Sequence, residues 1–252
     1  MDRLVATPGI IISFLFFVFH VAYQIVEEGP LRVAITFSIK AGNTCTIHQT
    51  VSLTYNSSLL RFDTTVDWNA NRRILKVEHA MAVTTDHAVY ETQFGQIKRP
   101  VHSNTSWDAA KFEVCGHRYA ALCEDNFGIA LLNNGKYGHS VLPGGKGLAL
   151  SLLRSSKAPD EAADMGHHEF SYGLLPFDGT VASANVAAEA AFFHAAPRVR
   201  DGAAIGGSFV QQAGSPNVFI DTIKMAEDNN NAVVVRLYEA YGGRGSVSLK
   251  FE

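Results

Sequence analysis

The ten residues Leu31–Lys40, LRVAITFSIK, decide the fold. Their apolar side chains alternate with mostly small or polar ones, at Leu31, Val33, Ile35, Phe37 and Ile39. Successive side chains of a β-strand point to opposite faces of a sheet. The alternation therefore predicts a strand with one face in a core and the other toward water, and the Ala-Gly-Asn of residues 41–43 predicts the turn that ends it.

The same alternation continues beyond this turn. It recurs over residues 45–55, 60–68 and 74–78, with turn-forming segments between them. Strands joined by turns of about three to five residues form hairpins, whereas parallel neighbours need crossovers of about a dozen residues or more. The sequence therefore predicts an all-β protein built from antiparallel strands.

The rest of the chain extends this pattern. Further strands are predicted over residues 111–115, 127–132, 147–154, 168–175, 217–226, 232–240 and 246–251. One short Ala-rich helix is predicted over Ala182–Ala196, since alanine favours helix and Pro197 cannot continue it. The order of these elements predicts an apolar N-terminal segment (1–26), a main β-supersandwich (27–179), an Ala-rich helix and linker (180–213) and a C-terminal β-hairpin region (214–252).

Composition and charge exclude two broad classes of protein. Of the 252 residues, 47% are hydrophobic, which is too many for a disordered chain. The 21 Lys and Arg residues are outnumbered by 24 Asp and Glu residues, giving a net charge of -3. Without a basic excess to hold a phosphate backbone, we expect no nucleic-acid partner.

The cysteines indicate the compartment. Cys45, Cys115 and Cys123 are too few for a disulfide scaffold, and they form no CxxC pair that would hold structural zinc. Their odd number favours a reducing compartment. Two glycosylation sequons, at residues 56–58 and 104–106, point weakly toward the secretory pathway instead.

The segment Ile10–Val26 carries no formal charge and is the part of the chain that could contact a membrane. A membrane span takes about 20 apolar residues, with a lower limit near 17. Three interpretations stay open for this segment: a membrane anchor, a signal peptide after Arg3, or a strand or helix buried in the fold.

Aromatic side chains in polar, aperiodic segments are the main positive signal for binding. Sugars stack on aromatic faces while polar groups fix their hydroxyls, although buried core aromatics give the same sequence pattern. Loops carry function more often than strands. The residues expected to face a carbohydrate or a domain interface are His102, Asn104, Trp107, Asp108, Asn133, Lys136 and Tyr137.

No motif for catalysis or metal binding accompanies these residues. The sequence lacks HExxH and GxSxG, and its Gly-rich residues 144–147 lack the Walker pattern. His167 and His168 are adjacent on a predicted strand, so they point to opposite faces and do not readily share one ion. Nothing in the spacing of the carboxylates selects a catalytic pair. We expect no catalytic residue and no metal ligand set in this chain.

Several long stretches resemble a known family. They include QFGQIKRPVHSNTSWDAAKFEVCGHRYA (93–120), FGIALLNNGKYGHS (127–140) and LSLLRSSKAPDEAADMGHHEFSYGLLPFDG (150–179). Together with FDTTVDWNANRRILKVEH (62–79) and NVFIDTIKMAEDNNNAVVVRLYEAYGGRG (217–245), they resemble the C-terminal half of glycoside hydrolase family 38. The resemblance is to the cytosolic and vacuolar branch of the α-mannosidases.

The resemblance implies a fold, a substrate and a partner. Family members have a galactose-mutarotase-like β-supersandwich and hydrolyse terminal α-linked mannose in oligosaccharides. Zinc and two catalytic Asp residues lie in an N-terminal catalytic domain that has no counterpart here. The resemblance thus implies that this chain has no cofactor of its own, that the missing catalytic domain and α-mannosides are its partners, and that the protein is cytoplasmic or vacuolar/lysosomal.

The chain also departs from the family pattern. The family favours Thr at the position of Val101 and Trp at that of Tyr119, and residues 181–213 are divergent. The resemblance further implies that the C-terminal hairpin region is truncated. It leaves open whether the chain is itself an enzyme. The alternatives are a non-catalytic carbohydrate-binding or interaction module, with Ile10–Val26 as a membrane tether, and a fragment that misfolds through unpaired sheet edges.

Overall fold

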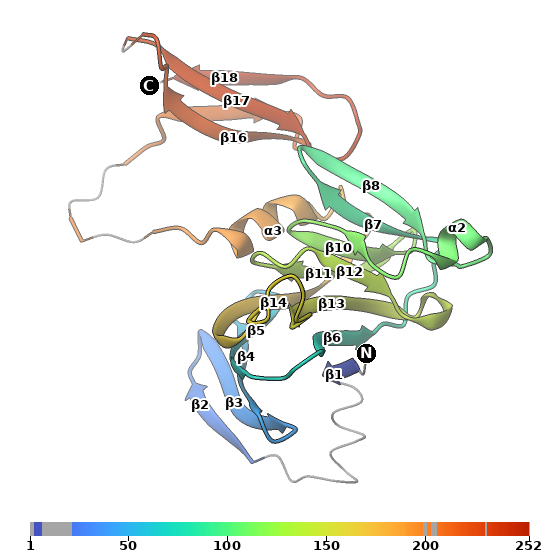
Figure 1. Cartoon of the computed structure of the whole chain (residues 1–252). Helices are drawn as coiled ribbons and strands as arrows, with labels where there is room; N and C mark the ends of the chain where they lie inside the picture. The colour runs from blue at the N-terminus through green and yellow to red at the C-terminus, as the bar shows by residue number, and fades with distance from the viewer. Residues whose placement is uncertain (1–2, 7–21, 199–200, 203–205, 230, 252) are drawn as a thin grey trace.

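The computed structural model describes residues 3–6, 22–198, 201–202, 206–229 and 231–251. They form two facing β-sheets, a helix against the outer face of the larger sheet, and two small C-terminal sheets (Figure 1). Every strand pairing among the described residues is antiparallel except that of β1 with β6. The all-β antiparallel sandwich predicted from the sequence is therefore confirmed.

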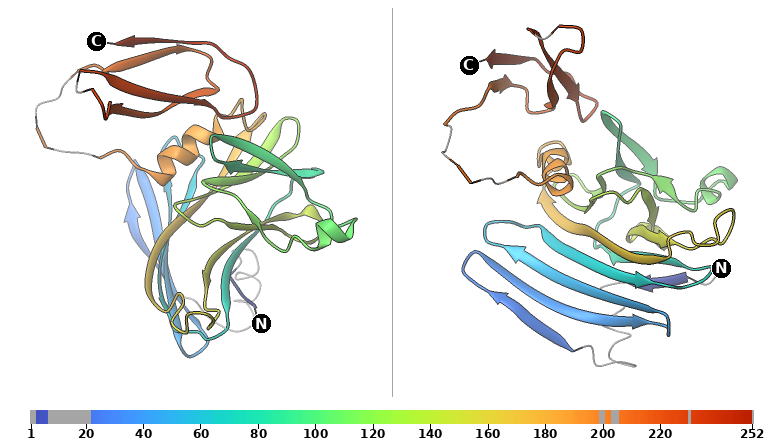
Figure 2. Two further views of the ribbon diagram at one scale, coloured as in Figure 1. Left: turned by 45° about the horizontal axis from the view of Figure 1, so that its top comes forward. Right: turned by 60° about the vertical axis from the view of Figure 1, so that its left-hand side comes forward.

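The larger sheet has nine strands. Its order is β2 (Tyr23–Glu28), β3 (Arg32–Ala41), β4 (Cys45–Thr54), β5 (Leu60–Trp68), β14 (Gly166–Asp178), β11 (Phe127–Asn133), β10 (Tyr119–Cys123), β7 (His87–Thr92) and β8 (Gly95–Pro100). Figure 2 shows the consecutive strands β2 to β5 layered side by side, with β2 at the outer edge. These strands are joined by the predicted hairpins.

The smaller sheet and the C-terminal elements complete the fold. The smaller sheet has the order β1 (Arg3–Ala6), β6 (Ile74–Ala80), β13 (Gly147–Arg154), β12 (Gly138–Val141) and β9 (Val114–Cys115). The C-terminal pairs are β15 (Val210–Gly214) with β18 (Val247–Phe251), and β16 (Val218–Met225) with β17 (Val233–Glu239). The helical elements are α2 (Ser106–Ala109), the 3-10 turn η1 (Pro143–Gly145) and α3 (Val186–His194).

The core lies between the two large sheets. Leu75, Val77, Leu148 and Leu150 of the smaller sheet are buried in one cluster with the inward side chains of the larger sheet. Trp68 at the end of β5 is fully buried, and its indole N–H donates to Ser155 Oγ at 3.2 Å. Because the indole finds a hydrogen-bond partner, this large side chain can be buried without leaving a polar atom unsatisfied.

The outer face of the larger sheet is covered at its centre. Val186, Ala190 and Phe193 of α3 pack with Tyr119 and Leu132 of the sheet in a second apolar cluster. Strands β10 and β11 are therefore buried on both faces, and they have nearly continuous apolar sequences instead of alternating ones.

Several predicted boundaries were wrong. The helix covers Val186–His194 and not Ala182–Ala196, because Ser183 bonds back to Thr180 in a separate turn. The strand predicted over 111–115 is reduced to two residues. The strands without a specific predicted counterpart are β1, β2, β7, β8, β10, β12 and β15. Most of Ile10–Val26 lies outside the described residues, but its last four residues begin β2.

Candidate functional site

The aperiodic segment singled out in the sequence forms a loop between β8 and β9. Within it, Thr105 caps the short helix α2: its hydroxyl accepts from the backbone N–H of Asp108 at 3.1 Å and donates to Asp108 Oδ2 at 2.7 Å. A side-chain oxygen at this position satisfies a backbone donor that the helix itself leaves unpaired. The capping bonds fix the shape of the loop.

Asp108 is the centre of charge in this loop. Its carboxylate lies 3.4 Å from Lys111 Nζ and 3.8 Å from His102 Nδ1. The hydrogen bond from Thr105, followed by the nearby Lys111 ammonium and the His102 ring, holds the pKa of Asp108 below its usual range although burial opposes this, so the group is ionised. The backbone N–H of Asn104 donates to His102 Nδ1 at 3.4 Å. The structure thus gathers four of the seven predicted residues, Trp107 included, in one loop.

Two aromatic side chains of this loop face solvent. Trp107 is 82% exposed and Phe112 is 84% exposed. Phe112 also lines an open cleft of about 720 Å³, together with Lys76, Glu113 and Arg154. Clefts of this size accommodate small ligands or segments of a partner protein.

The floor of this cleft is charged. Glu113 accepts from Lys76 Nζ and Ser151 Oγ. Burial acts to raise the pKa of Glu113, but the bonds from Lys76 and Ser151 outweigh it, so the pKa lies below its usual range. The cleft therefore combines an ionised carboxylate with the cations of Lys76 and Arg154.

The other three predicted residues lie in the turn between β11 and β12. Asn133 is fully buried: its amide donates to His117 O at 2.7 Å and accepts from the backbone N–H groups of Gly135 and Lys136 at 2.9 and 2.7 Å. The amide of Asn133 therefore shapes the turn. It sets the backbone that presents Lys136 and Tyr137.

Lys136 and Tyr137 have different surroundings. The Lys136 ammonium lies 4.8 Å from the centre of the Phe170 ring, and burial lowers its pKa although Asp164 partly opposes this. Tyr137 is half exposed and packs edge-on against His117 at 5.4 Å. Tyr137 is thus the member of this turn that can contact a ligand or a partner directly.

An apolar surface lies at the β2–β4 end of the larger sheet. Strand register places Ile25, Ile35 and Val51 in one row with the core residue Phe62, so these side chains share the inner face of the sheet. Ile25 and Ile35 are exposed, as are Val33 and Leu53 in a neighbouring row. We call these four residues, with Tyr23, the open apolar face. Contiguous exposed apolar patches mark interaction surfaces.

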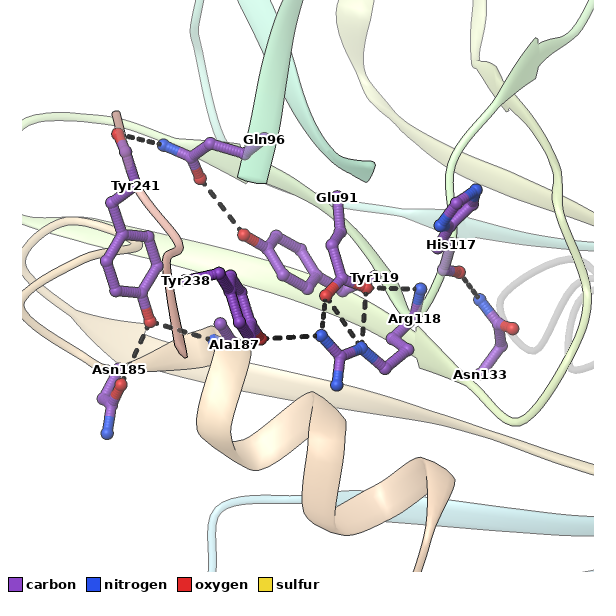
Figure 3. Close-up of polar contacts among 10 residues, drawn as sticks. All are labelled: Glu91, Gln96, His117, Arg118, Tyr119, Asn133, Asn185, Ala187, Tyr238 and Tyr241. Carbon is purple, nitrogen blue, oxygen red and sulfur yellow. Dashed lines mark hydrogen bonds and ion pairs between the residues drawn. The ribbon is translucent and has the colours of Figure 1, made fainter. Parts of the chain in front are cut away.

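A buried polar network connects the sandwich to the C-terminal strands (Figure 3). Glu91 is almost fully buried and binds the guanidinium of Arg118, with Nε at 2.7 and 3.0 Å from its two oxygens. The backbone N–H of Arg118 donates to the Glu91 carboxylate at 2.7 Å. The Nη2 of the Arg118 guanidinium donates to Tyr238 Oη at 3.0 Å. This ion pair joins β7 and β10 to β17.

A second chain of bonds runs parallel to the first (Figure 3). Tyr119 Oη donates to Gln96 Oε1 at 3.1 Å, and Gln96 Nε2 donates to Tyr241 O at 3.2 Å. Tyr241 Oη donates to Asn185 Oδ1 and accepts from the backbone N–H of Ala187, both at 3.1 Å. Sequence reasoning missed this network because its partners are far apart in the chain and follow no spacing motif.

The described residues offer neither a metal site nor a membrane-spanning helix. They hold no group of three or more His, Cys, Asp or Glu side chains placed to bind a metal ion. His167 and His168 point apart as predicted, toward Asp67 and the backbone oxygen of Asp164. Within the same described ranges, no helix is both long and apolar enough to cross a bilayer.

Comparisons with known proteins agree with this architecture. The profile described as "Glycosyl hydrolases family 38 C-terminal domain" matches residues 16–162, and the "family 38 C-terminal beta sandwich domain" matches residues 217–252. An alpha-mannosidase from Enterococcus faecalis V583 has a similar fold, with a TM-score of 0.73 at 17% identity over 87% of this chain and 30% of that one.

Two α-mannosidases are similar to this chain in sequence. Alpha-mannosidase G of Dictyostelium discoideum is 40% identical over 87% of this chain, and mouse alpha-mannosidase 2C1 is 43% identical over 85%. The chain spans 21% of the length of each relative. The fold is an antiparallel β-sandwich, and both matching profiles describe C-terminal domains of glycosyl hydrolases. The chain belongs to glycosyl hydrolase family 38, and it corresponds to the family's C-terminal domain.

Proposed function

We propose that this chain serves as the C-terminal β-sandwich of an α-mannosidase that hydrolyses terminal α-mannosyl residues. The observation that carries the proposal is the 40–43% identity to two α-mannosidases over more than four fifths of the chain. In the complete enzyme, zinc and the catalytic carboxylates belong to the catalytic region. The side chains described here offer no fitting ligand set for that metal, so we derive no zinc-dependent step from them.

The catalytic region is proposed to pack against the open apolar face. Its exposed side chains continue, row by row, into the core of the sandwich. Burial of such a face stabilises an interface by roughly 25 cal/mol per Å² of apolar surface. A large apolar contact would hold the sandwich and the catalytic region in a fixed orientation. A fixed orientation is needed if both parts line the active site.

The two groups of predicted residues are proposed to face the sugar or the interface. Trp107 and Tyr137 have exposed rings suited to stacking on a sugar or on a neighbouring domain. Asp108 and Asn133 support them, since one fixes the helix cap and the other fixes the turn. His102, Asn104 and Lys136 line the same loop and turn.

A chimaera tests the proposal directly. The segment of alpha-mannosidase G that aligns with this chain is replaced by the chain itself, and hydrolysis of p-nitrophenyl α-mannoside is measured. We expect zinc-dependent hydrolysis at a rate close to that of the parent. A well-folded chimaera without turnover would contradict the proposed role.

Single substitutions in the chimaera test the residue roles. Trp107→Ala and Tyr137→Ala are expected to lower kcat/KM by about tenfold while the melting temperature stays unchanged. Phe192→Ala is the matched control, because Phe192 is an exposed aromatic residue on α3, away from the loop and the turn. Equal losses of activity and stability would assign the two rings a purely structural role.

Assays on the purified chain alone distinguish the role as a mannosidase C-terminal domain from that of a carbohydrate-binding module. We expect no hydrolysis of the aryl mannoside with added zinc, and turnover would place catalysis within this chain. The exposed ring of Trp107 favours a carbohydrate-binding module as the second candidate. Titration with mannose in a calorimeter distinguishes the two, because binding by the isolated chain is expected only for such a module.

We further propose a cytoplasmic or vacuolar location for the protein. The three cysteines are all unpaired, as expected in a reducing compartment. Fluorescence microscopy of the tagged protein tests the location. A mass shift after enzymatic deglycosylation would instead show passage through the secretory pathway, with Asn56 or Asn104 as the modified residue.

A further inference from the structure

A small cavity of about 90 Å³ lies behind the loop of residues 101–113. Its walls come from β7, β8, β9 and β12, and its rim from the loop. The lining side chains that matter here are Tyr90, Arg99, His102, Asp108, Lys111 and His139. The volume is sufficient for several water molecules or one small ion.

His139 lines this cavity and lacks a hydrogen-bond partner. The residue is 0% exposed, and neither Nδ1 nor Nε2 makes a hydrogen bond of good geometry, although the backbone of His117 lies near the ring. Buried polar atoms in native proteins are nearly always paired, so an unpaired buried ring indicates a missing group. The absent Cβ of Gly116 leaves space for this ring, since a Cβ there would lie 2.9 Å from His139 Cδ2.

Arg99 contributes an unpaired charge to the same cavity. Its Nη1 is buried without a partner, and its guanidinium lies 4.8 Å from the centre of the Tyr90 ring. Tyr90 also packs against His139 edge-on at 6.0 Å, so the three side chains form one cluster. Arg99 as a whole is only partly buried, but the N–H groups of its buried Nη1 still need an acceptor, which an anionic counter-charge would supply.

The carboxylate that lines the cavity does not supply that counter-charge. Asp108 is bonded to Thr105 and Lys111. Among the described residues, no ion pair within 4.0 Å joins any carboxylate to Arg99. The Lys111 ammonium offsets the charge of Asp108 at the rim, so with Arg99 the charged groups of the wall are net positive toward an entering anion.

We propose that this cavity binds a small carboxylate anion, held by Arg99 Nη1 and by a ring N–H of His139. A neutral imidazole has one N–H to donate, and an arginine bonds carboxylate oxygens well. The limited volume excludes larger acids. The rim residues His102 and Asp108 are shared with the proposed sugar-facing residues, but the two proposed ligand contacts, Arg99 and His139, are not. The existence of the site does not depend on the mannosidase assignment.

The test uses the full chain and two sodium salts at pH 7 and equal ionic strength. Acetate fits the cavity, whereas gluconate carries the same carboxylate on a chain too large to enter. We expect acetate at saturation to raise the melting temperature by about 4 °C relative to gluconate. Arg99→Gln is expected to abolish this difference. Lys98→Gln is the matched control: it removes the same charge from an exposed neighbour on β8 and should leave the acetate effect intact.

A second measurement avoids reliance on the variant. Saturation-transfer NMR on the unmodified chain should show transfer to the acetate methyl protons, and formate should compete for the site while gluconate should not. Identical melting curves in acetate and gluconate, or transfer that gluconate abolishes, would overturn the proposal.

The mannosidase chimaera identifies the natural source of the carboxylate. If a side chain of the catalytic region fills the cavity, acetate will no longer raise the melting temperature of the chimaera. If a free ion fills it, the acetate effect will persist.

Discussion

The centre of the nine-stranded sheet and its β2–β4 end are built from similar apolar strands but have different surroundings. Strands β10, β11 and β14 lie between the smaller sheet and α3, and their side chains are buried on both faces. Strands β2, β3 and β4 have the cleaner alternation, yet their inner face is exposed at Ile25, Val33 and Ile35. Alternation therefore shows that a strand has an apolar face, but not what covers that face.

The centre of the sheet and its β2–β4 end therefore differ in role. Burial at the centre stabilises the domain, whereas exposed apolar side chains at the end can contact a partner. The centre of the sheet supplies most of the burial that holds the domain together. At the β2–β4 end, Cys45 and Ile47 join the core, whereas the side chains of the open apolar face stay exposed among the described residues. Substitutions at the centre of the sheet, at its β2–β4 end and in the flanking elements test this contrast.

The largest contrast is expected between two leucines of the same sheet. Leu131 in β11 is 0% exposed and Leu53 in β4 is 40% exposed. Leu131→Ala leaves a cavity in the core and should lower the free energy of unfolding by about 3–4 kcal/mol. Leu53→Ala should cost less than about 1 kcal/mol. Urea denaturation of the two variants measures both, and similar losses would show that the β2–β4 end is already packed.

Acid should destabilise the core through buried histidine. His79 packs against the stacked rings of Phe62 and Tyr172, and burial lowers its pKa from 6.5 to about 4. The unfolded chain therefore binds the proton more readily than the folded chain. Stability is fully present above pH 6.5 and is lost as the pH falls toward 4, by about 3 kcal/mol for this group.

His79→Phe isolates this contribution, because the new ring remains among aromatic neighbours but does not titrate. His139 keeps a similarly lowered pKa of about 4, so the variant should lose roughly half of the pH slope between 6.5 and 4. Stability curves of both proteins in urea across this pH range provide the measurement. An unchanged slope would mean that His79 is charged or exposed in the folded state.

The ion pair between the sandwich and β17 should contribute less than the core but more than any surface charge. Glu91→Gln leaves the Arg118 guanidinium without its counter-charge and is expected to cost about 2–3 kcal/mol. Glu169→Gln is the control, because Glu169 is a well exposed carboxylate near His167. Hydrogen exchange should show that the C-terminal strands lose protection first in Glu91→Gln. A loss spread evenly over the chain would contradict the linking role of the pair.

Sequence reasoning succeeded where one face of a strand meets water. Strands β3 to β6 and β16 to β18 were predicted nearly to the residue because their alternation was visible. Strand β10 was missed since its first four residues are buried on both faces and show no period, and β8 was missed because it is a polar edge strand. The pairing that brings Arg118 to Glu91, or His139 to Arg99, depends on strand register, which the sequence does not reveal.

The loop of residues 101–113 should depend on its helix cap. Thr105→Ala removes the hydroxyl that binds Asp108 and should cost about 1 kcal/mol. Thr105→Ser keeps the hydroxyl and is expected to retain the stability of the parent. Melting temperatures measured side by side test the pair. A loss in Thr105→Ser as large as that in Thr105→Ala would assign the effect to the methyl group.

The smallest effect on stability is expected at the open apolar face, where the effect on interaction should be greatest. Ile35→Lys places a charge on an exposed position of β3 and should change the unfolding free energy of the isolated chain by no more than about 0.5 kcal/mol. In the mannosidase chimaera the same charge would be buried against the catalytic region, and burying an unpaired charge is costly. We therefore expect the chimaera to lose activity and thermal stability. Ser38→Lys, an exposed change on the same strand but in a polar register position, should affect neither protein. If Ile35→Lys is tolerated in the chimaera, the catalytic region does not lie on this face, and the apolar side chains of β2 to β4 must be covered by something else.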